Sequence, residues 1–286
     1  MKYWIAYFLA FAVATTALPF IAQNSVLGQV ERTMTIHKNG ETVEISVEEY
    51  LLAAMITQSN GIESPECLKA LAVSIRSLAT ACSLYGCKHE SYALCDDAAC
   101  CIALGCPDDV EKSRLDMLKT ACAETNGIVL TYDSLPAMTL FTRCASKGTS
   151  DNAEYPYLVS VPESESCQKH VSESEHEIEN ELFDLLGNTE ETPPYLIYDD
   201  NDKCVLAITK GKTADVRDIQ RALSLASNEF VLEIDGTTLF ARCHGIGHGY
   251  GLNLCGAENM AKIGFGYEKI LEFYYPKLKM NKIRGY

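Results

Sequence analysis

The sequence predicts a fold of the α+β class: a single mixed domain of helices and antiparallel strands, preceded by an N-terminal membrane helix. Strand-like segments that alternate around turn residues are interspersed with segments whose apolar residues recur at helical spacing. The order of these segments is mixed and shows no internal repeat. With 286 residues, 47% of them hydrophobic, the chain is long and apolar enough to bury a core.

The first predicted element is an uncharged, mostly apolar run from Tyr3 to Ala22, which is long enough to cross a bilayer. Lys2 precedes the run and no A-x-A cleavage site closes it, which favours a signal-anchor over a cleaved signal peptide. Residues 23–42 are predicted as a linker and first strand, and residues 43–280 as the folded domain. The bulk of the chain then lies outside the cytoplasm, as a single-pass membrane protein or, if cleaved, a secreted one.

Turn and cap residues define the next elements. Asn39-Gly40 between two alternating segments predicts a hairpin of Thr33–Ile36 with Thr42–Ile45. Ser46 and Glu49 form a capping box for a helix from Val47 to about Thr57.

A second helix is predicted from Pro65, capped by Ser64, to near Gly86. Its apolar residues recur at i, i+3 and i+4, which predicts one buried face: Leu68, Leu71, Ala72, Ile75, Leu78, Ala79 and Cys82.

Two irregular regions interrupt the rest of the chain. Residues 87–107 are predicted as a cysteine-rich loop, and the acidic insertion at 163–191 is predicted as a solvated helix or loop. The predicted helices are Val110–Glu124, Asp215–Leu225, Gly256–Gly264 and Tyr267–Tyr274. The predicted strands are Gly127–Tyr132, Pro136–Phe141, Cys204–Thr209, Phe230–Ile234 and Thr238–Ala241.

Net charge and cysteine content limit the class of partner and compartment. The formal charge of −15 argues against a nucleic-acid partner, because phosphate binding needs a basic face. The chain has 13 cysteines, which in an oxidising compartment would pair and leave one free.

Four soft or borderline metal ligands gather within thirteen residues: His89, Cys95, Cys100 and Cys101. Zinc takes four such ligands tetrahedrally, so the spacing predicts a structural zinc site with no position left for water. Two alternatives stay open: disulfides, since Cys82, Cys87 and Cys106 lie close by in sequence, and free buried thiols.

Residues 245–257 contain four glycines that alternate with Ile246, His248 and Tyr250. This pattern allows positive φ and close backbone approach, and it leaves a histidine on an otherwise bare strand or turn. A tight strand-to-helix connection is the simpler interpretation. A phosphate loop is disfavoured, because Tyr250 or Leu252 stands where G-x-G-x-x-G needs its third glycine.

The glycine segment, together with Met260–Gly264 and Tyr267–Tyr275, resembles the signature of the stage II sporulation protein D family, which includes the amidase-enhancer proteins. Asn253, Leu254 and Cys255 stand where the family has Ser-Gln-Tyr. The resemblance spans nearly all of residues 43–280. It also implies zinc, because similar proteins bind zinc at His…Cys…His-Cys, with Cys100 here in the place of the second histidine.

The stretch Tyr50–Asn60, followed by Glu66–Arg76, resembles the central motif of the same family. The resemblance implies a lytic transglycosylase-like activity that cuts peptidoglycan glycan strands with one glutamate as general acid and base. Gln58 stands at that glutamate position, and Ser59 and Asn60 replace the Met-Pro that follows it. An amide cannot exchange a proton near neutral pH, which predicts impaired cleavage.

Candidate site residues follow from these alignments. The catalytic candidates are Gln58, His248 and, as a substitute carboxylate, Glu63, for which a solvated loop charge is the simpler interpretation. Arg76 lies in an apolar helix and either pins a pocket or pairs with a carboxylate. The candidate substrate-binding residues are Lys69, Arg76, Gly247, Gly249 and Asn253.

The sequence therefore predicts an extracytoplasmic protein that binds or cleaves peptidoglycan glycan strands, possessing a structural zinc ion and no nucleic-acid partner. A catalytically silent glycan-binding scaffold is the main alternative, and an unrelated zinc-stabilised secreted domain is the third. A companion cell-wall hydrolase is a further predicted partner, for which the acidic insertion offers a docking segment.

Overall fold

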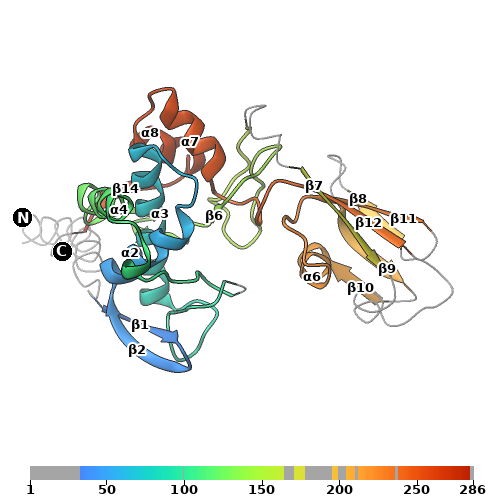
Figure 1. Cartoon of the computed structure of the whole chain (residues 1–286), viewed down its shortest axis with the longest axis horizontal. Helices are drawn as coiled ribbons and strands as arrows, with labels where there is room; N and C mark the ends of the chain where they lie inside the picture. Colours follow the sequence, from blue (N-terminus) through green and yellow to red (C-terminus); the bar gives the residue numbers. More distant parts are fainter. Residues whose placement is uncertain are drawn as a thin grey trace, which may run out of the picture. The chain divides into compact units, whose positions relative to one another are not determined.

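The computed structural model describes residues 33–98, 100–163, 171–177, 195–198, 204–209, 212–235 and 238–283 (Figure 1). The predicted membrane helix and linker before Thr33 lie outside these residues, as does most of the acidic insertion. Helices and mainly antiparallel strands confirm the mixed class. A single domain is not confirmed, because the chain divides into two compact units: residues up to Thr139 with 266–272 and 276–286, and residues 140–265 with 273–275.

The first unit is built around helix α3, with α2 and α4 packed against it (Figure 1). Two three-stranded sheets complete the unit, in the orders β2-β1-β3 and β14-β4-β5. The bounds are β1 (Thr33–Lys38), β2 (Glu41–Ser46), α2 (Val47–Gln58), α3 (Pro65–Tyr85), β3 (Leu94–Cys95), η1 (Pro107–Asp109), α4 (Lys112–Glu124), β4 (Ile128–Tyr132), β5 (Leu135–Pro136), α8 (Tyr267–Tyr274, shared with the second unit) and β14 (Lys279–Lys282).

The hairpin turn and the helix cap that the sequence predicts are both present at the start of this unit. Asn39 and Gly40 have φ of 53° and 83°, as the hairpin turn between β1 and β2 requires. Ser46 Oγ accepts from the Glu49 N–H, and the Glu49 carboxylate accepts from the Ser46 N–H, so the capping box that begins α2 is confirmed.

Helix α3 begins at Pro65 and ends before Gly86 as predicted, and all seven residues of its predicted buried face are buried, but the burial extends beyond that face. Every residue from Ala70 to Cys82 is buried. Among the described residues, α3 is the one helix long and apolar enough to cross a membrane, yet its side chains are covered by the rest of the first unit, as in a core helix.

The second unit contains two three-stranded antiparallel sheets, in the orders β10-β9-β8 and β11-β12-β7, and a short parallel pair of β6 with β13. A core that includes Ile219, Phe230 and Leu239 lies between α6 and these sheets. The bounds are β6 (Phe141–Thr142), β7 (Val171–Glu177), β8 (Tyr195–Tyr198), β9 (Cys204–Thr209), β10 (Lys212–Asp215), α6 (Val216–Ala222), β11 (Phe230–Asp235), β12 (Thr238–His244), β13 (Leu252–Asn253) and α7 (Leu254–Lys262).

Two predictions of secondary structure need correction. The strand expected at Pro136–Phe141 is divided: Leu135–Pro136 pairs with β4, whereas Phe141–Thr142 pairs with β13. The described part of the acidic insertion is neither helix nor loop but the strand β7, which pairs along its whole length with β12. Residues 171–175 of β7 are all exposed, so the strand has no apolar face that a sequence pattern would reveal.

Candidate functional site

Gln58, which the sequence resemblance predicts at the catalytic position, ends helix α2 and is half-buried. Its amide Nε2 donates to Thr57 Oγ1 at 3.2 Å. The following turn is held by Arg114 of α4, which donates to the Ser59 and Ile62 carbonyls, both at 2.7 Å. Arg114 was not predicted, because it belongs to no motif and the residues it binds lie more than 50 positions earlier in the sequence.

Glu63, the proposed substitute acid, lies on the exposed loop between α2 and α3. Glu66 is held by other groups. Its carboxylate accepts hydrogen bonds from Lys69 Nζ at 2.6 Å and from the Tyr267 N–H at 2.9 Å. The hydrogen bonds from Lys69 and Tyr267 outweigh the effect of burial and lower the pKa of Glu66, so it remains ionised near neutral pH.

Lys69, a candidate substrate-binding residue, holds two carboxylates at once. Its Nζ lies 2.6 Å from Glu66 and 2.7 Å from Glu124. Hydrogen bonds to Glu124 and Glu66 raise the pKa of Lys69 above its usual value. In this structure Lys69 therefore links α3 to α4 as an ion-pair residue.

Arg76 pairs with a carboxylate, the second of the two alternatives given for it. The side chain is fully buried, and Nε and Nη2 donate to the two Glu48 oxygens at 2.6 and 3.0 Å. Nη1 donates to the Thr125 carbonyl at 2.9 Å, and Nη2 also donates to the Cys122 carbonyl at 3.0 Å. The guanidinium thus ties α2 to the end of α4, with its donors engaged inside the protein.

The predicted metal ligands come together in the first unit. One donor atom from each of four residues lies within 4.8 Å of the others: His89, Cys95, Cys100 and Cys101. His89 Nε2 lies 3.4 Å from Cys101 Sγ and 3.5 Å from Cys100 Sγ, and the two sulfurs are 3.9 Å apart. Tetrahedral Zn–S and Zn–N bonds give edges of about 3.8 Å between sulfurs and about 3.6 Å between sulfur and nitrogen. The four donors can therefore hold a metal ion.

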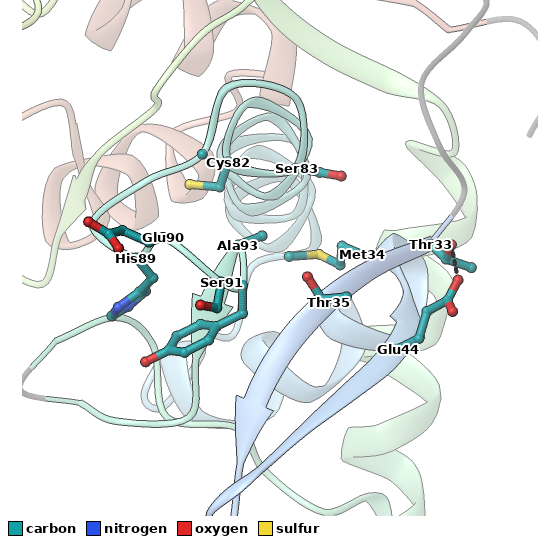
Figure 2. A pocket seen from close by; sticks show the side chains of 12 residues that line it. Thr33, Met34, Thr35, Glu44, Cys82, Ser83, His89, Glu90, Ser91 and Ala93 are labelled. Carbon is teal, nitrogen blue, oxygen red and sulfur yellow. Dashed lines mark hydrogen bonds between the residues drawn. The ribbon is translucent and has the colours of Figure 1, made fainter.

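Aromatic stacking fixes the imidazole of this cluster. The Tyr92 ring lies 4.3 Å from the His89 ring and 5.1 Å from the His37 ring on β1. His89 also lines a cavity of about 250 Å³ between β1, the end of α3 and the loop of residues 89–93 (Figure 2). The stack was not predicted, because His37 and Tyr92 meet only when β3 pairs with β1.

The thiols of Cys95 and Cys101 are neutral near pH 7 when no metal is bound. Burial, followed by the neighbouring Cys101 and Cys100, raises the pKa of Cys95 to about 12. Burial also raises the pKa of Cys101. A metal ion must therefore displace protons to bind. Of the cysteines named for the disulfide alternative, Cys82 and Cys87 form a disulfide and Cys106 is free.

The return segment of the cysteine-rich loop packs along α2. The Gly105 N–H donates to the Ala53 carbonyl at 2.9 Å, and Thr57 Oγ1 donates to the Ala103 carbonyl at 2.6 Å. A Cβ at Gly105 would collide with the Ile56 side chain, so glycine permits this approach. The metal cluster and Gln58 are thus connected through the last two turns of α2.

The glycine segment lies in the second unit, against residues 140–144. Gly245, Gly247, Gly249 and Gly251 all have positive φ, between 68° and 102°, as the alternation predicts. A Cβ at Gly251 would collide with the Leu140 carbonyl oxygen, and one at Gly247 would lie 2.5 Å from Thr142 Oγ1. Gly247, a candidate substrate-binding residue, therefore permits a close backbone approach. A Cβ at Gly249, the other such candidate, would meet only an ordinary contact, 3.6 Å from Asn228 Oδ1.

Neighbouring side chains orient His248 within this segment. Its Nδ1 accepts from the Tyr250 N–H at 3.1 Å, which puts the proton of the neutral ring on Nε2, and the two rings stack at 5.4 Å. Asn228 Nδ2 donates to the His248 carbonyl at 2.7 Å. Sequence reasoning missed Asn228, which is buried and belongs to no motif.

Asn253, where the family signature has serine, is fully buried just before α7. Its Oδ1 accepts from the Ala145 N–H at 3.2 Å and its Nδ2 donates to the Ala145 carbonyl at 3.1 Å. This two-bond clamp holds the segment after β6 against β13.

Comparisons with known proteins show what the chain is similar to. The family model described as "Stage II sporulation protein" matches residues 36–132. Stage II sporulation protein D of Bacillus subtilis (strain 168) is 28% identical over 264 residues, which cover 83% of this chain and 75% of that protein. Stage II sporulation protein D of Bacillus amyloliquefaciens is 26% identical over 279 residues, covering 91% and 80%.

These matches support a divergent member of the stage II sporulation protein D family. The range matched by the family model contains α2, α3 and all four cluster residues, and it lies in the first unit. The glycine segment at residues 245–257 lies outside the range that the stage II sporulation protein family model matches, and it belongs to the second unit.

Proposed function

We propose that this protein binds peptidoglycan glycan strands outside the cytoplasm during sporulation, as a lytic transglycosylase-like protein whose cleavage step is impaired. Family membership supports the link to sporulation, and the resemblance of the central motif supplies the glycan chemistry. The observation that supports an impaired step is Gln58, an amide at the end of α2, where the motif resemblance predicts the family's glutamate.

The chemistry of the amide explains the proposed impairment. The family's reaction needs a carboxyl group that protonates the glycosidic oxygen and then, as carboxylate, removes the proton of the sugar's 6-hydroxyl, whose oxygen closes an anhydro ring. Gln58 donates through its N–H groups and accepts through its carbonyl oxygen, but it transfers no proton near neutral pH. It can therefore hold a sugar oxygen without driving the bond cleavage.

A catalytically silent glycan-binding scaffold is the second candidate. The pairing of the other charged residues in the two motif segments favours it, since Glu66 is ionised and paired with Lys69, while Arg76 is buried against Glu48. Only a relocated acid, with Glu63 as the candidate, would then restore cleavage. The predicted membrane anchor and companion hydrolase remain part of this proposal.

Incubation of the purified protein with peptide-stripped glycan strands tests the proposal. We expect the strands to be retained by the immobilised protein, with few or no anhydro ends detected by mass spectrometry. Product that disappears in Glu63→Gln but persists in Glu90→Gln, a matched change at another exposed glutamate of the first unit, would identify Glu63 as a relocated acid. Absence of retention would overturn glycan binding.

We propose zinc as the ion held by the cluster of His89, Cys95, Cys100 and Cys101. Three thiolates and one imidazole favour zinc over hard cations, and they leave no place for a bound water, so its role would be structural. Protein purified without chelators is expected to contain one zinc per chain by plasma mass spectrometry. Removal of the zinc should lower the melting temperature, by about 2–4 °C for each kcal/mol lost. Metal-free protein with the same melting temperature would contradict the proposal.

A further inference from the structure

Asn228 carries an unpaired acceptor in the second unit. Only 2% of the residue is exposed, and its side-chain Oδ1 accepts no hydrogen bond from the described part of the chain. Its Nδ2 donates to the His248 carbonyl at 2.7 Å, which fixes the orientation of the amide, because a flipped amide would set two oxygens against each other. A buried acceptor without a donor is costly, so this oxygen calls for an explanation.

The unpaired oxygen faces the side-chain position of Gly249. A Cβ at this glycine would lie 3.6 Å from Asn228 Oδ1, and apart from the two flanking residues it would meet no other heavy atom of the described residues within 4 Å. Gly249 has a φ of 75° and is half-buried, so this position suits glycine and reaches the surface. The lack of a side chain therefore leaves an open position beside Oδ1.

Backbone donors around the open position are already engaged. The Gly249 N–H donates to Thr142 Oγ1 at 3.2 Å, and the Tyr250 N–H donates to His248 Nδ1 at 3.1 Å. The backbone N–H of the asparagine itself donates to the Gly247 carbonyl at 3.2 Å. None of these groups can turn toward Oδ1 without breaking a bond that orders the glycine segment. The missing donor is therefore expected from a bound molecule.

We propose that Asn228 is a glycan-binding residue, whose Oδ1 accepts a hydrogen bond from a sugar that enters the open position at Gly249. This inference rests on the glycan binding proposed above. The N-acetylated sugars of a glycan strand carry two kinds of donor, the hydroxyl O–H and the acetamido N–H, and an amide oxygen accepts from either. A few polar groups placed in this way fix the orientation of a ligand. Asn228 thus holds the strand and takes no part in proton transfer.

Two variants test the contact from its two sides. Asn228→Leu removes the acceptor, whereas Gly249→Ala keeps the acceptor and fills the open position in front of it. We expect each purified full-length variant to bind peptide-stripped glycan strands about 5–100-fold more weakly than wild type, because a polar group buried in the complex loses its partner.

Gly264→Ala is the matched control for backbone strain. Gly264 also lies in the second unit and has a φ of 99°, but a Cβ there would meet no heavy atom of the described residues within 4 Å beyond its own neighbours. The control should bind glycan as wild type does. Thermal unfolding establishes that each variant is folded at the temperature of the binding measurement.

Two oligosaccharides distinguish the donors. Chitin oligosaccharides carry an acetamido N–H at the carbon where cellulose oligosaccharides carry a hydroxyl. A loss of affinity in Gly249→Ala for both sugars identifies a hydroxyl donor, whereas a loss confined to chitin oligosaccharides identifies the acetamido N–H.

Equal glycan affinity in wild type, Asn228→Leu and Gly249→Ala would overturn the inference and leave Oδ1 to an ordered water. A second measurement needs no variant. The side-chain amide resonances of Asn228 should shift in the nuclear magnetic resonance spectrum of wild type when glycan strands are added, and unchanged resonances would also overturn the inference. If wild type itself retains no glycan, the proposed function fails first and this inference falls with it, so the two failures are distinguishable.

Discussion

Replacing Gln58 with glutamate is expected to raise glycan cleavage by about 10²–10⁴-fold, the usual contribution of a general acid and base. The substitution adds a carboxyl group at the end of α2 without changing the length of the side chain. The turn that follows is already held by Arg114 through Ser59 and Ile62, so the new group enters an ordered backbone. Anhydro ends released from peptide-stripped glycan strands, counted by mass spectrometry, measure the gain.

Gln58→Asn is the matched control, because it alters the same position without adding a carboxyl group and should give no gain. The pH dependence provides a second check, since activity that needs a protonated carboxyl group falls as that group ionises. Glycan retention without product in Gln58→Glu would show that replacement of the glutamate is not the cause of the impaired step.

The first half of the first unit was predictable because its signals are local. The Asn39-Gly40 turn, the Ser46–Glu49 capping box and the start of α3 at Pro65 each depend on residues within a few positions of one another. The metal ligands were predictable for the same reason, since all four fall between residues 89 and 101.

The full burial of α3 was not predictable from periodicity. Small polar residues on its other side look like a solvated face, but hydrogen bonds to distant parts of the chain form at these positions. Ser77 Oγ accepts from the Leu130 N–H at 2.8 Å, and the Ser74 carbonyl accepts from Thr139 Oγ1 at 2.7 Å. Hydrogen bonds to residues more than 50 positions away thus bury a side of α3 that its composition would leave in water.

The supporting residues of the candidate site were missed for a related reason. Arg114 holds the turn after Gln58 and Asn228 holds the carbonyl of His248, and each acts on a segment distant in sequence. Their residue types are common on surfaces, so nothing in the sequence separates them from solvated side chains. Motifs identify the group at a reacting position, whereas tertiary contacts decide which residues orient it.

Replacing Arg76 with leucine is expected to lower the free energy of unfolding of the first unit by about 2–5 kcal/mol, because each buried acceptor left without its donor costs about 1–3 kcal/mol and Glu48, whose side chain is 34% exposed, loses its partner. The change leaves Glu48 without its partner and removes donors from the Cys122 and Thr125 carbonyls at the end of α4. Native-state hydrogen exchange of the α3 amides measures the loss in this unit separately from the other.

Two further variants separate the causes of that loss. Arg76→Lys keeps the charge, but a single ammonium cannot reach both Glu48 oxygens and the α4 carbonyls, so we expect an intermediate loss. Adding Glu48→Leu to Arg76→Leu should recover part of the stability if the unpaired carboxylate is its main cause. A loss below about 1 kcal/mol in Arg76→Leu would instead contradict the structural role, because it would mean that water reaches the abandoned groups. The same measurement therefore tests whether Arg76 holds α2, α3 and α4 together.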